Sequence, residues 1–506
     1  MTLHPGIIAA RDPDRIAVVI DDAMLTYGQL DADSRAIAAR LFDLGMRQGD
    51  IFAMLVSNRP EFFTHAWAAQ RSGLYYVPIP TRLTVDEIAH ILCDSGARVL
   101  AVEPDLADVA VAAVAQRPIM VIGIDTKPGE NLPEPPAIEG ADMLYTSGST
   151  GRPKGVRRPI TGAPLGTEKR RVDRARALFG LDGESVFLSP APFYHAAPLR
   201  FTMNVLRVGG TVVGVRKFDA REVLVAIARH RVTHSQWVPT MFVRLLALSD
   251  AERHAHDLSS HRVAIHSAAP CPAEIKRAMI DWWGPIVHEC YAGTESIGFT
   301  HATSQEWLAR PGTVGRTVGS TIHILDDDGN DCPAGTIGAV YFAGAAPLSY
   351  HGDPAKTRAA HDTQGRATIG DVGYVDAEGY LFLTDRAAFT IISGGVNIYP
   401  TEVEAAFAAH PDVADIAVFG VPDAEFGEAV FALIELAPDV SPSVATAQAL
   451  IAQARSRLAT FKLPRRIAFG AVGRTETGKL HKAALRARVD DFAVFDMGKV
   501  QLEAAA

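Results

Sequence analysis

A run of hydroxyl and glycine residues that ends in a lysine follows the apolar residues 143–145. Its candidate phosphate ligands are Thr146, Ser147, Gly148, Ser149, Thr150, Gly151 and Lys154. Backbone N–H groups and hydroxyls can surround a phosphate, glycine permits close approach, and lysine adds a positive charge. A Walker loop ends in Gly-Lys-Ser/Thr, whereas Lys154 lies between Pro153 and Gly155. The run therefore predicts a phosphate-binding loop that differs from the loop of kinases and GTPases.

Residues 145–155 resemble the nucleotide-binding signature of the adenylate-forming superfamily, which comprises acyl-CoA and aryl-CoA synthetases, firefly-type luciferases and the adenylation domains of peptide synthetases. The resemblance extends from about residue 10 to about residue 490. It implies an enzyme that binds ATP and Mg²⁺ and activates a carboxylic acid.

A second motif, residues 291–295, follows the phosphate loop by roughly 140 residues and matches the Tyr-Gly-x-Thr-Glu motif of this superfamily. Ala292 replaces the first glycine. The resemblance implies that Tyr291 lies against adenine, that Thr294 contacts the α-phosphate, and that Glu295 binds Mg²⁺. Each role suits its residue, because tyrosine has a flat aromatic face, threonine a hydroxyl, and glutamate a carboxylate that Mg²⁺ accepts.

Three shorter matches complete the predicted nucleotide site. Residues 267–270 resemble a strand end that lies beside adenine in the superfamily; they are Ser267, Ala268, Ala269 and Pro270, with Ser267 where glycine is usual. Gly370-Asp371 resembles the Thr-Gly-Asp motif, although Ile369 replaces the threonine. Its aspartate, and the arginine matched by Arg386, are implied to face the ribose. An ordinary turn aspartate is the alternative for Asp371.

The acyl site is predicted from segments that end strands. Tyr194 and His195 match an element that borders the acyl group in synthetases, and Ala292 and Gly293 supply small side chains. Trp237 and Met241 suit a pocket wall and plain core packing equally well. Peptide-synthetase domains carry an aspartate near residue 194 that binds an α-amine, and none is found here. These residues favour an apolar, non-amino carboxylic acid as substrate.

The C-terminal part resembles the small domain that rotates between two catalytic arrangements in this superfamily. Its implied hinge residues are Asp385, Arg386 and Ala388, and its implied coenzyme A contacts are Gly394, Gly395 and Phe461. Lys479 matches the lysine that completes the adenylation site, with Gly473 in place of a proline before Arg474. Ala388 and Phe389 occupy positions where a charged pair is frequent.

These residues need a framework of strands and helices, which the hydrophobic pattern predicts. Strands are expected at residues 15–20, 51–56, 74–79 and 97–102, with helices at 29–44 and 61–72 and a further helix opened by a Thr84-x-x-Glu87 capping box. Such alternation predicts parallel sheets covered by helices. We expect an α/β fold in which a large N-terminal domain (residues 1–385) has parallel-type α/β subdomains and a small β-rich subdomain. A small mobile α+β domain (residues 386–506) follows, with its first helix opened by a Thr401-x-x-Glu404 capping box.

The bulk composition indicates neither a nucleic-acid-binding protein nor a disordered one. The 506 residues carry a net charge of −9, and the four cysteines form no CxxC pair. No segment reaches the ~18 apolar residues of a membrane span, so we expect a cytoplasmic protein without stable membrane insertion. The basic run 169–171 is interpreted as a solvated helix face or as an attractor for phosphates.

The resemblance implies an ATP-dependent acid–CoA ligase that forms an acyl-AMP, releases pyrophosphate and then makes a thioester with coenzyme A. The acid is a small molecule whose class stays open among fatty, aryl and polycyclic acids. Two alternatives remain: an acyl-AMP ligase that serves a carrier protein or another acceptor, and a catalytically idle relative. A monomer and a homodimer are both compatible with the sequence.

Overall fold

The computed structural model describes residues 3–497 except 116, 127–128, 130, 147–152, 345–347, 387–388, 394–395, 424–425, 456, 459, 476–479 and 481. The predicted residues Ser147, Gly148, Ser149, Thr150, Gly151, Ala388, Gly394, Gly395 and Lys479 lie outside this part of the chain. Among the helices of the described part, none is both long and apolar enough to cross a membrane.

The first sheet is 6-stranded, with the order β6-β5-β3-β4-β7-β8. Its strands are β3 (Ile51–Leu55), β4 (Tyr75–Pro78), β5 (Val99–Val102), β6 (Met120–Gly123), β7 (Ala141–Thr146) and β8 (Lys154–Arg157). They are parallel except for the β7–β8 hairpin. The early helices are α1 (Pro5–Ala9), α2 (Tyr27–Asp43), α3 (Pro60–Arg71), α4 (Val85–Ser95) and α5 (Ala107–Val114), with a 3₁₀ turn at Pro104–Leu106.

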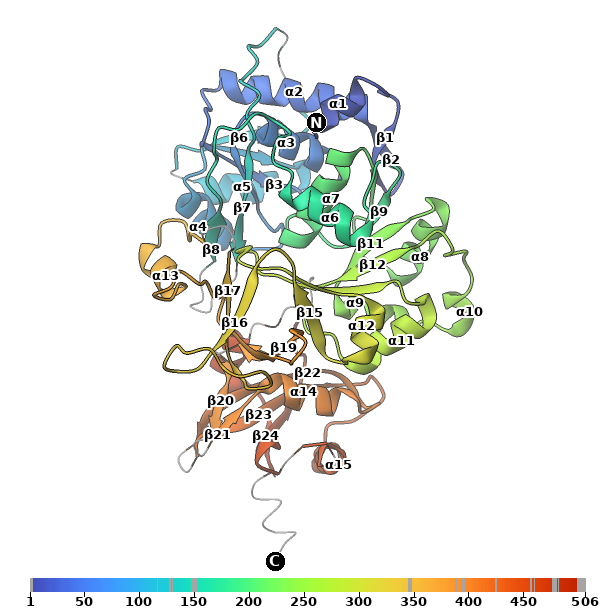
Figure 1. Ribbon diagram of the computed structural model, residues 1–506, viewed down its shortest axis with the longest axis vertical. Helices are drawn as coiled ribbons and strands as arrows, with labels where there is room; N and C mark the ends of the chain where they lie inside the picture. The colour runs from blue at the N-terminus through green and yellow to red at the C-terminus, as the bar shows by residue number, and fades with distance from the viewer. Residues whose placement is uncertain are drawn as a thin grey trace, which may run out of the picture.

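The second sheet has 13 strands and joins a parallel half to an antiparallel half (Figure 1). The parallel half contains β1 (Ile16–Ile20), β9 (Val186–Ser189), β10 (Thr211–Gly214), β11 (His234–Trp237), β12 (Val263–His266) and β13 (Val287–Tyr291), with β2 (Ala23–Thr26) antiparallel at its edge. The antiparallel half contains β14 (Thr300–Ala302), β15 (Thr313–Thr317), β16 (Thr321–Leu325), β17 (Gly338–Ala343), β18 (Asp371–Val375) and β19 (Leu381–Arg386). The predicted β-rich subdomain is therefore continuous with the parallel strands.

Helices connect and cover the strands of the second sheet. They are α6 (Arg170–Phe179), α7 (Ala196–Val208), α8 (Ala220–Arg229), α9 (Pro239–Leu246), α10 (Asp250–Arg253), α11 (Ala273–Trp283), α12 (Ser304–Ala309) and α13 (Pro354–Ala359). One core cluster combines Phe52 and Phe62, from the first sheet and α3, with Phe187 and Phe193 from β9 and the segment after it. The aromatic core thus holds the first two sheets together.

The third sheet belongs to the C-terminal part, at the bottom of Figure 1. It contains β20 (Ile391–Ser393), β21 (Val396–Ile398), β22 (Val413–Asp423), β23 (Gly427–Leu436), β24 (Arg466–Phe469) and β25 (Val494–Asp496). The helices are α14 (Pro400–Ala408), α15 (Val444–Ala454) and α16 (Lys482–Ala487), with 3₁₀ turns at Thr460–Lys462 and Val489–Asp491. Two core clusters of this part draw all their members from residues 391–497.

The predicted fold class is confirmed, because the chain has two mixed α/β sheets in a large N-terminal part and a smaller α+β part after it. The Thr84–Glu87 capping box forms as predicted. The prediction of a Thr401–Glu404 capping box is wrong, because α14 begins at Pro400 and Thr401 lies inside its first turn. Glu404 instead accepts the backbone N–H of Val418 at 2.8 Å and pairs with Lys482 at 2.9 Å. The boundary at residues 385 and 386 stays a prediction.

Candidate active site

Strand β7 leads into the candidate phosphate loop and pairs with β8 so that Thr146 lies opposite Lys154. Burial of Met143 and Leu144 anchors β7 in the core. Lys154 Nζ lies 3.3 Å from Oδ2 of Asp353, the N-cap residue of α13. The hairpin therefore fixes both flanks of the loop, while the phosphate contacts of its tip stay a prediction.

The Tyr291 motif begins where β13 ends and lies against β18. The hydroxyl of Tyr291 donates a hydrogen bond to the carboxylate of Asp371, the first residue of β18. Asp371 is buried, and its backbone is paired with that of Arg386 on β19. The structure thus brings together the residue predicted for adenine and the two predicted for ribose.

The turn after Tyr291 is packed closely. Glu295 accepts a hydrogen bond at its Oε1 from the Tyr350 hydroxyl at 3.1 Å. A Cβ atom on Gly293 would lie 2.8 Å from Cδ1 of Ile369 and 2.9 Å from Oε2 of Glu295, so a larger residue here would displace the ends of these two side chains. Ser296 ends the turn with φ of 57°, in the left-handed region that non-glycine residues seldom occupy.

The segment 267–270 follows β12, the parallel neighbour of β13. The backbone N–H of Ser267 donates to the carbonyl of Trp237 at 3.2 Å, which ties this segment to the end of β11. Ala268 has φ of 78°, and Ala269 and Pro270 follow it. The segment therefore starts at the same sheet edge as Tyr291, and its adenine contacts stay a prediction.

The residues predicted for the acyl site divide into two groups. The rings of Tyr194 and His195 are 4.8 Å apart between centroids, directly before α7. Trp237 is fully buried, Met241 is buried too, and the Trp237 ring contacts Phe242 and Trp283. Core packing accounts for the positions of Trp237 and Met241, and their role as pocket walls stays a prediction.

Asn58 fixes the segment that carries Tyr194, a role that the sequence did not reveal. Its side-chain amide donates to the carbonyls of Ala191 at 3.1 Å and Val215 at 2.9 Å, and its Oδ1 accepts from the N–H of Phe193 at 2.8 Å. Asn58 is 4 % exposed. Because all three bonds are buried, this one amide determines how the chain enters α7.

Comparison with known proteins identifies the family. A family model described as "AMP-binding enzyme" matches residues 8–349, and one described as "AMP-binding enzyme C-terminal domain" matches residues 402–479. The chain belongs to the AMP-binding enzyme family. The resemblance to the acid–CoA ligase branch of the adenylate-forming superfamily is thereby confirmed, and with it the prediction of an enzyme of that class.

Relatives of this AMP-binding enzyme cover nearly its full length. A feruloyl-CoA synthase of an Amycolatopsis species is 33% identical over 95% of this chain and 97% of its own. A fatty acid–[acyl-carrier-protein] ligase of Streptomyces coeruleorubidus is 30% identical over 95% of this chain and 94% of its own. The o-succinylbenzoate CoA synthetase of Bacillus subtilis, solved with its acyl-adenylate intermediate, has a TM-score of 0.83 and 27% identity, covering 96% of this chain and 98% of its own.

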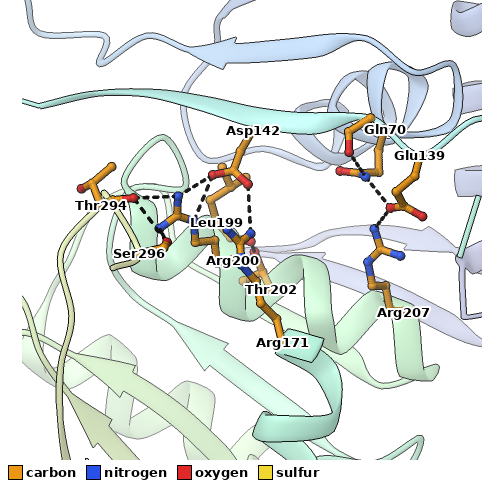
Figure 2. A network of polar contacts seen from close by, with 11 residues as sticks. Gln70, Glu139, Asp142, Arg171, Leu199, Arg200, Thr202, Arg207, Thr294 and Ser296 are labelled. Atoms are coloured by element: carbon orange, nitrogen blue, oxygen red, sulfur yellow. Dashed lines mark hydrogen bonds and ion pairs between the residues drawn. The ribbon is translucent and has the colours of Figure 1, made fainter. Parts of the chain in front are cut away.

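This AMP-binding enzyme also contains a buried ionic network that its sequence did not reveal (Figure 2). Asp142 on β7 receives hydrogen bonds from Arg171 on α6 at 3.0 Å and from Arg200 on α7 at 2.9 and 2.7 Å. Burial opposes the charge on Asp142, but the guanidinium groups of Arg200 and Arg171 outweigh it and hold the pKa of Asp142 well below its usual range. Arg171 belongs to the basic run 169–171, for which the sequence predicted a solvated helix face or attraction of phosphates. The structure instead shows this side chain in an ion pair with Asp142, which neither alternative included.

The donor groups of this AMP-binding enzyme suit the predicted Mg²⁺. Glu295 Oε2 has no hydrogen-bond partner among the described residues, whereas Oε1 accepts from Tyr350. The described ranges contain no group of three or more His, Cys, Asp or Glu side chains that could hold a metal ion by themselves. One carboxylate supplemented by substrate phosphates is the usual binding mode of Mg²⁺, so the residues present fit this ion.

Proposed function

We propose that this chain is an ATP-dependent acid–CoA ligase. It activates an apolar, non-amino carboxylic acid as acyl-AMP with release of pyrophosphate, and then transfers the acyl group to the thiol of coenzyme A. The observation that carries the proposal is the convergence of Tyr291, Glu295 and Asp371 at one edge of the second sheet, with the phosphate-loop strand β7 joined to the same turn through Arg200.

In the first half-reaction the substrate carboxylate attacks the α-phosphorus of ATP in line, and pyrophosphate leaves. Catalysis of this kind depends on positioning and on compensation of negative charge. Asp371 accepts from the ribose hydroxyls, Thr294 donates to the α-phosphate, and Lys154 and Lys479 offset the charge of the phosphates. The Lys154 ammonium lies 3.3 Å from the carboxylate of Asp353, and phosphate oxygens of ATP would replace that carboxylate.

Glu295 would hold Mg²⁺ through its Oε2 atom. When bound, Mg²⁺ neutralises phosphate charge as the α-phosphorus is attacked. The Tyr350 hydroxyl fixes the Glu295 carboxylate from the other side.

In the second half-reaction the C-terminal domain, residues 386–506, turns about the hinge Asp385–Arg386–Ala388. Lys479 then leaves the site, and Gly394 and Gly395 border the path of the thiol. Two features support an independently moving body: cores made entirely from residues 391–497, and the exposed ion pair between Arg457 and Glu274 across the two parts, 3.1 Å long. Exposed ion pairs contribute only about 0–1 kcal/mol, so this one offers little resistance to rotation.

The substrate acid is apolar in this proposal because Tyr194, Ala292 and Gly293 offer aromatic and small side chains. The relatives named above act on ferulate, fatty acid and o-succinylbenzoate. These names support a carboxylic acid substrate and leave its class open between fatty and aryl acids.

A carrier protein is the second candidate for the acyl acceptor. The Streptomyces relative that transfers fatty acid to an acyl carrier protein supports this candidate. Phe461, which is 53% exposed on the C-terminal domain, supports coenzyme A, because an exposed ring can stack on its adenine. Phe461→Ala should raise the KM for coenzyme A and leave the KM for ATP unchanged.

The Lys479→Ala variant tests the two half-reactions separately. We expect it to abolish release of pyrophosphate from ATP and acid, because the lysine is needed only while the α-phosphate is transferred. Thioester formation from supplied acyl-adenylate and coenzyme A should stay close to the wild-type rate. Equal loss of both half-reactions would contradict the assignment of Lys479 to adenylation alone.

A further inference from the structure

Arg200 joins the strand that carries the phosphate loop to the turn that carries Thr294 and Glu295 (Figure 2). Its Nε and Nη2 atoms donate to Oδ2 of Asp142 at 2.9 and 2.7 Å. The same Nη2 donates to the Thr294 carbonyl at 3.0 Å, and Nη1 donates to Oγ of Ser296 at 3.1 Å. One guanidinium therefore spans segments that lie 58 and 94 residues from it in the chain.

The Asp142 end of this connection is rigid. Asp142 is 9 % exposed, and its second oxygen is held by Arg171 at 3.0 Å. Hydrogen bonds between ionised partners are roughly twice as strong as neutral ones, and two donors on one carboxylate oxygen also fix the orientation of the guanidinium. Arg200 is thus anchored to β7 before it reaches the turn.

The Ser296 end of the connection holds a backbone that is costly to maintain. Ser296 has φ of 57°, and its N–H closes a tight turn on the Gly293 carbonyl at 3.0 Å. A non-glycine residue in the left-handed region is strained and persists only where neighbouring contacts hold its backbone there. The hydrogen bonds from Arg200 to Thr294 and Ser296 lie on either side of Glu295 and are contacts of this kind.

We propose that Arg200 is a positioning residue for adenylation, a role that rests on the proposed function. Because β7 and the turn 294–296 both bind its guanidinium, Arg200 keeps the phosphate loop aligned with the Thr294 hydroxyl and the Glu295 carboxylate. Arg200 need not touch substrate for this role. Its loss lets the two halves of the site shift relative to each other, which lowers the rate more than the affinity.

Helix α7 offers a matched control. Arg207, on the same helix, pairs with Glu139, and the two side chains are 8% and 5% exposed, compared with 16% and 9% for Arg200 and Asp142. Glu139 also accepts a hydrogen bond from Gln70 at 2.6 Å, so this ion pair too belongs to a buried polar network (Figure 2). None of the contacts that the described residues make with Arg207 involves the turn 294–296. Arg207→Lys therefore reports the cost of disturbing a buried ion pair on α7 without disturbing the turn.

The test compares Arg200→Lys with Arg207→Lys in pyrophosphate release, using an acid that the wild-type enzyme accepts. We expect Arg200→Lys to lower kcat by about tenfold to a hundredfold with a smaller change in the KM for ATP, since displacements near 1 Å have effects of that size. Arg207→Lys should lower the melting temperature similarly and keep kcat within about twofold of the wild type. Equal kcat losses in the two variants, or an unchanged kcat in folded Arg200→Lys, would overturn the positioning role.

Ser296→Ala covers the case in which Arg200→Lys does not fold, because it removes the bond from Nη1 and a bond of 3.4 Å from the Ser296 hydroxyl to the Thr294 carbonyl, and leaves the bonds between Arg200 and Asp142 in place. A threefold or larger loss of kcat is expected for it, and an unchanged kcat would overturn the proposal. If the wild type releases no pyrophosphate with any acid, the proposed function itself fails. The positioning role then fails with it, whereas release by the wild type together with equal kcat losses in Arg200→Lys and Arg207→Lys overturns the positioning role alone.

Discussion

The hydroxyl of Tyr291 joins two segments that lie 80 residues apart and that both serve the nucleotide in the proposed function. Tyr291 ends β13 and Asp371 begins β18, so one hydrogen bond sets the distance between a ring suited to adenine and a carboxylate suited to ribose. Asp371 is 6 % exposed, and burying a polar group costs free energy unless it is hydrogen-bonded. The phenol thus orients the carboxylate that the ribose would meet.

Tyr291→Phe should raise the KM for ATP by about tenfold to a hundredfold, because a hydrogen bond to a charged group contributes about 1.5–3 kcal/mol. The measurement is the ATP dependence of pyrophosphate release. Tyr380→Phe is the control, since the Tyr380 hydroxyl donates to a different carboxylate, Glu306, at 3.0 Å. A KM that stays at the wild-type value in Tyr291→Phe, or that rises equally in both variants, would contradict this role.

Among the residues of the site, the sequence predicted those that form short motifs. Tyr291 and Glu295 belong to one motif, so a single match located both, and the structure brings Tyr291 to the predicted Asp371. Asp142, Arg200 and Asn58 could not be predicted, because their partners lie 29 to 157 residues away and no local pattern marks them. Long-range partners of this kind follow from the packing of whole elements.

At the scale of elements, the entry into α7 depends on a loop after β3. Asn58 follows β3 and satisfies three backbone groups: the carbonyls of Ala191 and Val215 and the N–H of Phe193. These bonds connect the first sheet to the segment that ends in Tyr194 and His195. The position of the predicted acyl site is therefore set by contacts between two sheets.

Asn58→Ala should destabilise the protein by about 2–4 kcal/mol, because it leaves buried backbone groups without partners. It should also raise the KM for the acid more than the KM for ATP, since the displaced segment borders the predicted acyl site and not the nucleotide site. Chemical denaturation and steady-state kinetics measure the two effects. Unchanged stability, or equal changes in both KM values, would refute this account of Asn58.

Elements themselves were predicted well where hydrophobic periodicity and local capping agree. The strand over 51–56 and the helix after Thr84 both form, the latter with its reciprocal capping bonds. The Thr401–Glu404 prediction failed because Pro400 has a fixed φ that suits the first helical position, so the helix starts before Thr401. The pattern of a capping box cannot by itself decide which residue is the N-cap. The union of parallel and antiparallel strands in one sheet was likewise not predictable, because it depends on which strand edges meet.

At the scale of the whole molecule, buried histidines make stability depend on pH. Burial lowers the pKa of His65 to about 4, although its bond to the Glu61 carbonyl opposes the shift, and burial also lowers the pKa of His288 to about 4 and of His261 to about 3. These side chains belong to separate parts of the N-terminal region: α3, β13 and the segment before β12. Each stays neutral in the folded protein at a pH where it is protonated in the unfolded chain.

The free energy of unfolding should therefore be highest above pH 6.5 and fall as the pH drops from 6.5 towards 4, because the unfolded state then binds more protons. For His65 the loss at pH 5 is about 2 kcal/mol, from a shift between 6.5 and about 4. His65→Gln should reduce the pH dependence, and the same change at the exposed His254 should not. Denaturation at pH 7, 6 and 5 measures the pH dependence of the free energy of unfolding. An identical dependence in wild type and His65→Gln would contradict this prediction.

The residues predicted for the two half-reactions are divided between the large part and the small part of the chain. The residues predicted for the nucleotide, Tyr291 and Asp371, lie on the large part, whereas Lys479 and Phe461 belong to the C-terminal part. In the proposed function, pyrophosphate is released before the thioester forms. Acid-dependent release of pyrophosphate is therefore the step to test first.

The most direct measurement is pyrophosphate release from ATP and Mg²⁺ across fatty, aryl and polycyclic carboxylic acids, with and without coenzyme A. We expect that one class of acid releases pyrophosphate, that chelation of Mg²⁺ stops the release, and that an acyl-CoA accumulates once coenzyme A is present. Release of pyrophosphate without any thioester would assign the enzyme to another acceptor. No release with any acid would contradict the central claim that this chain forms acyl-adenylates.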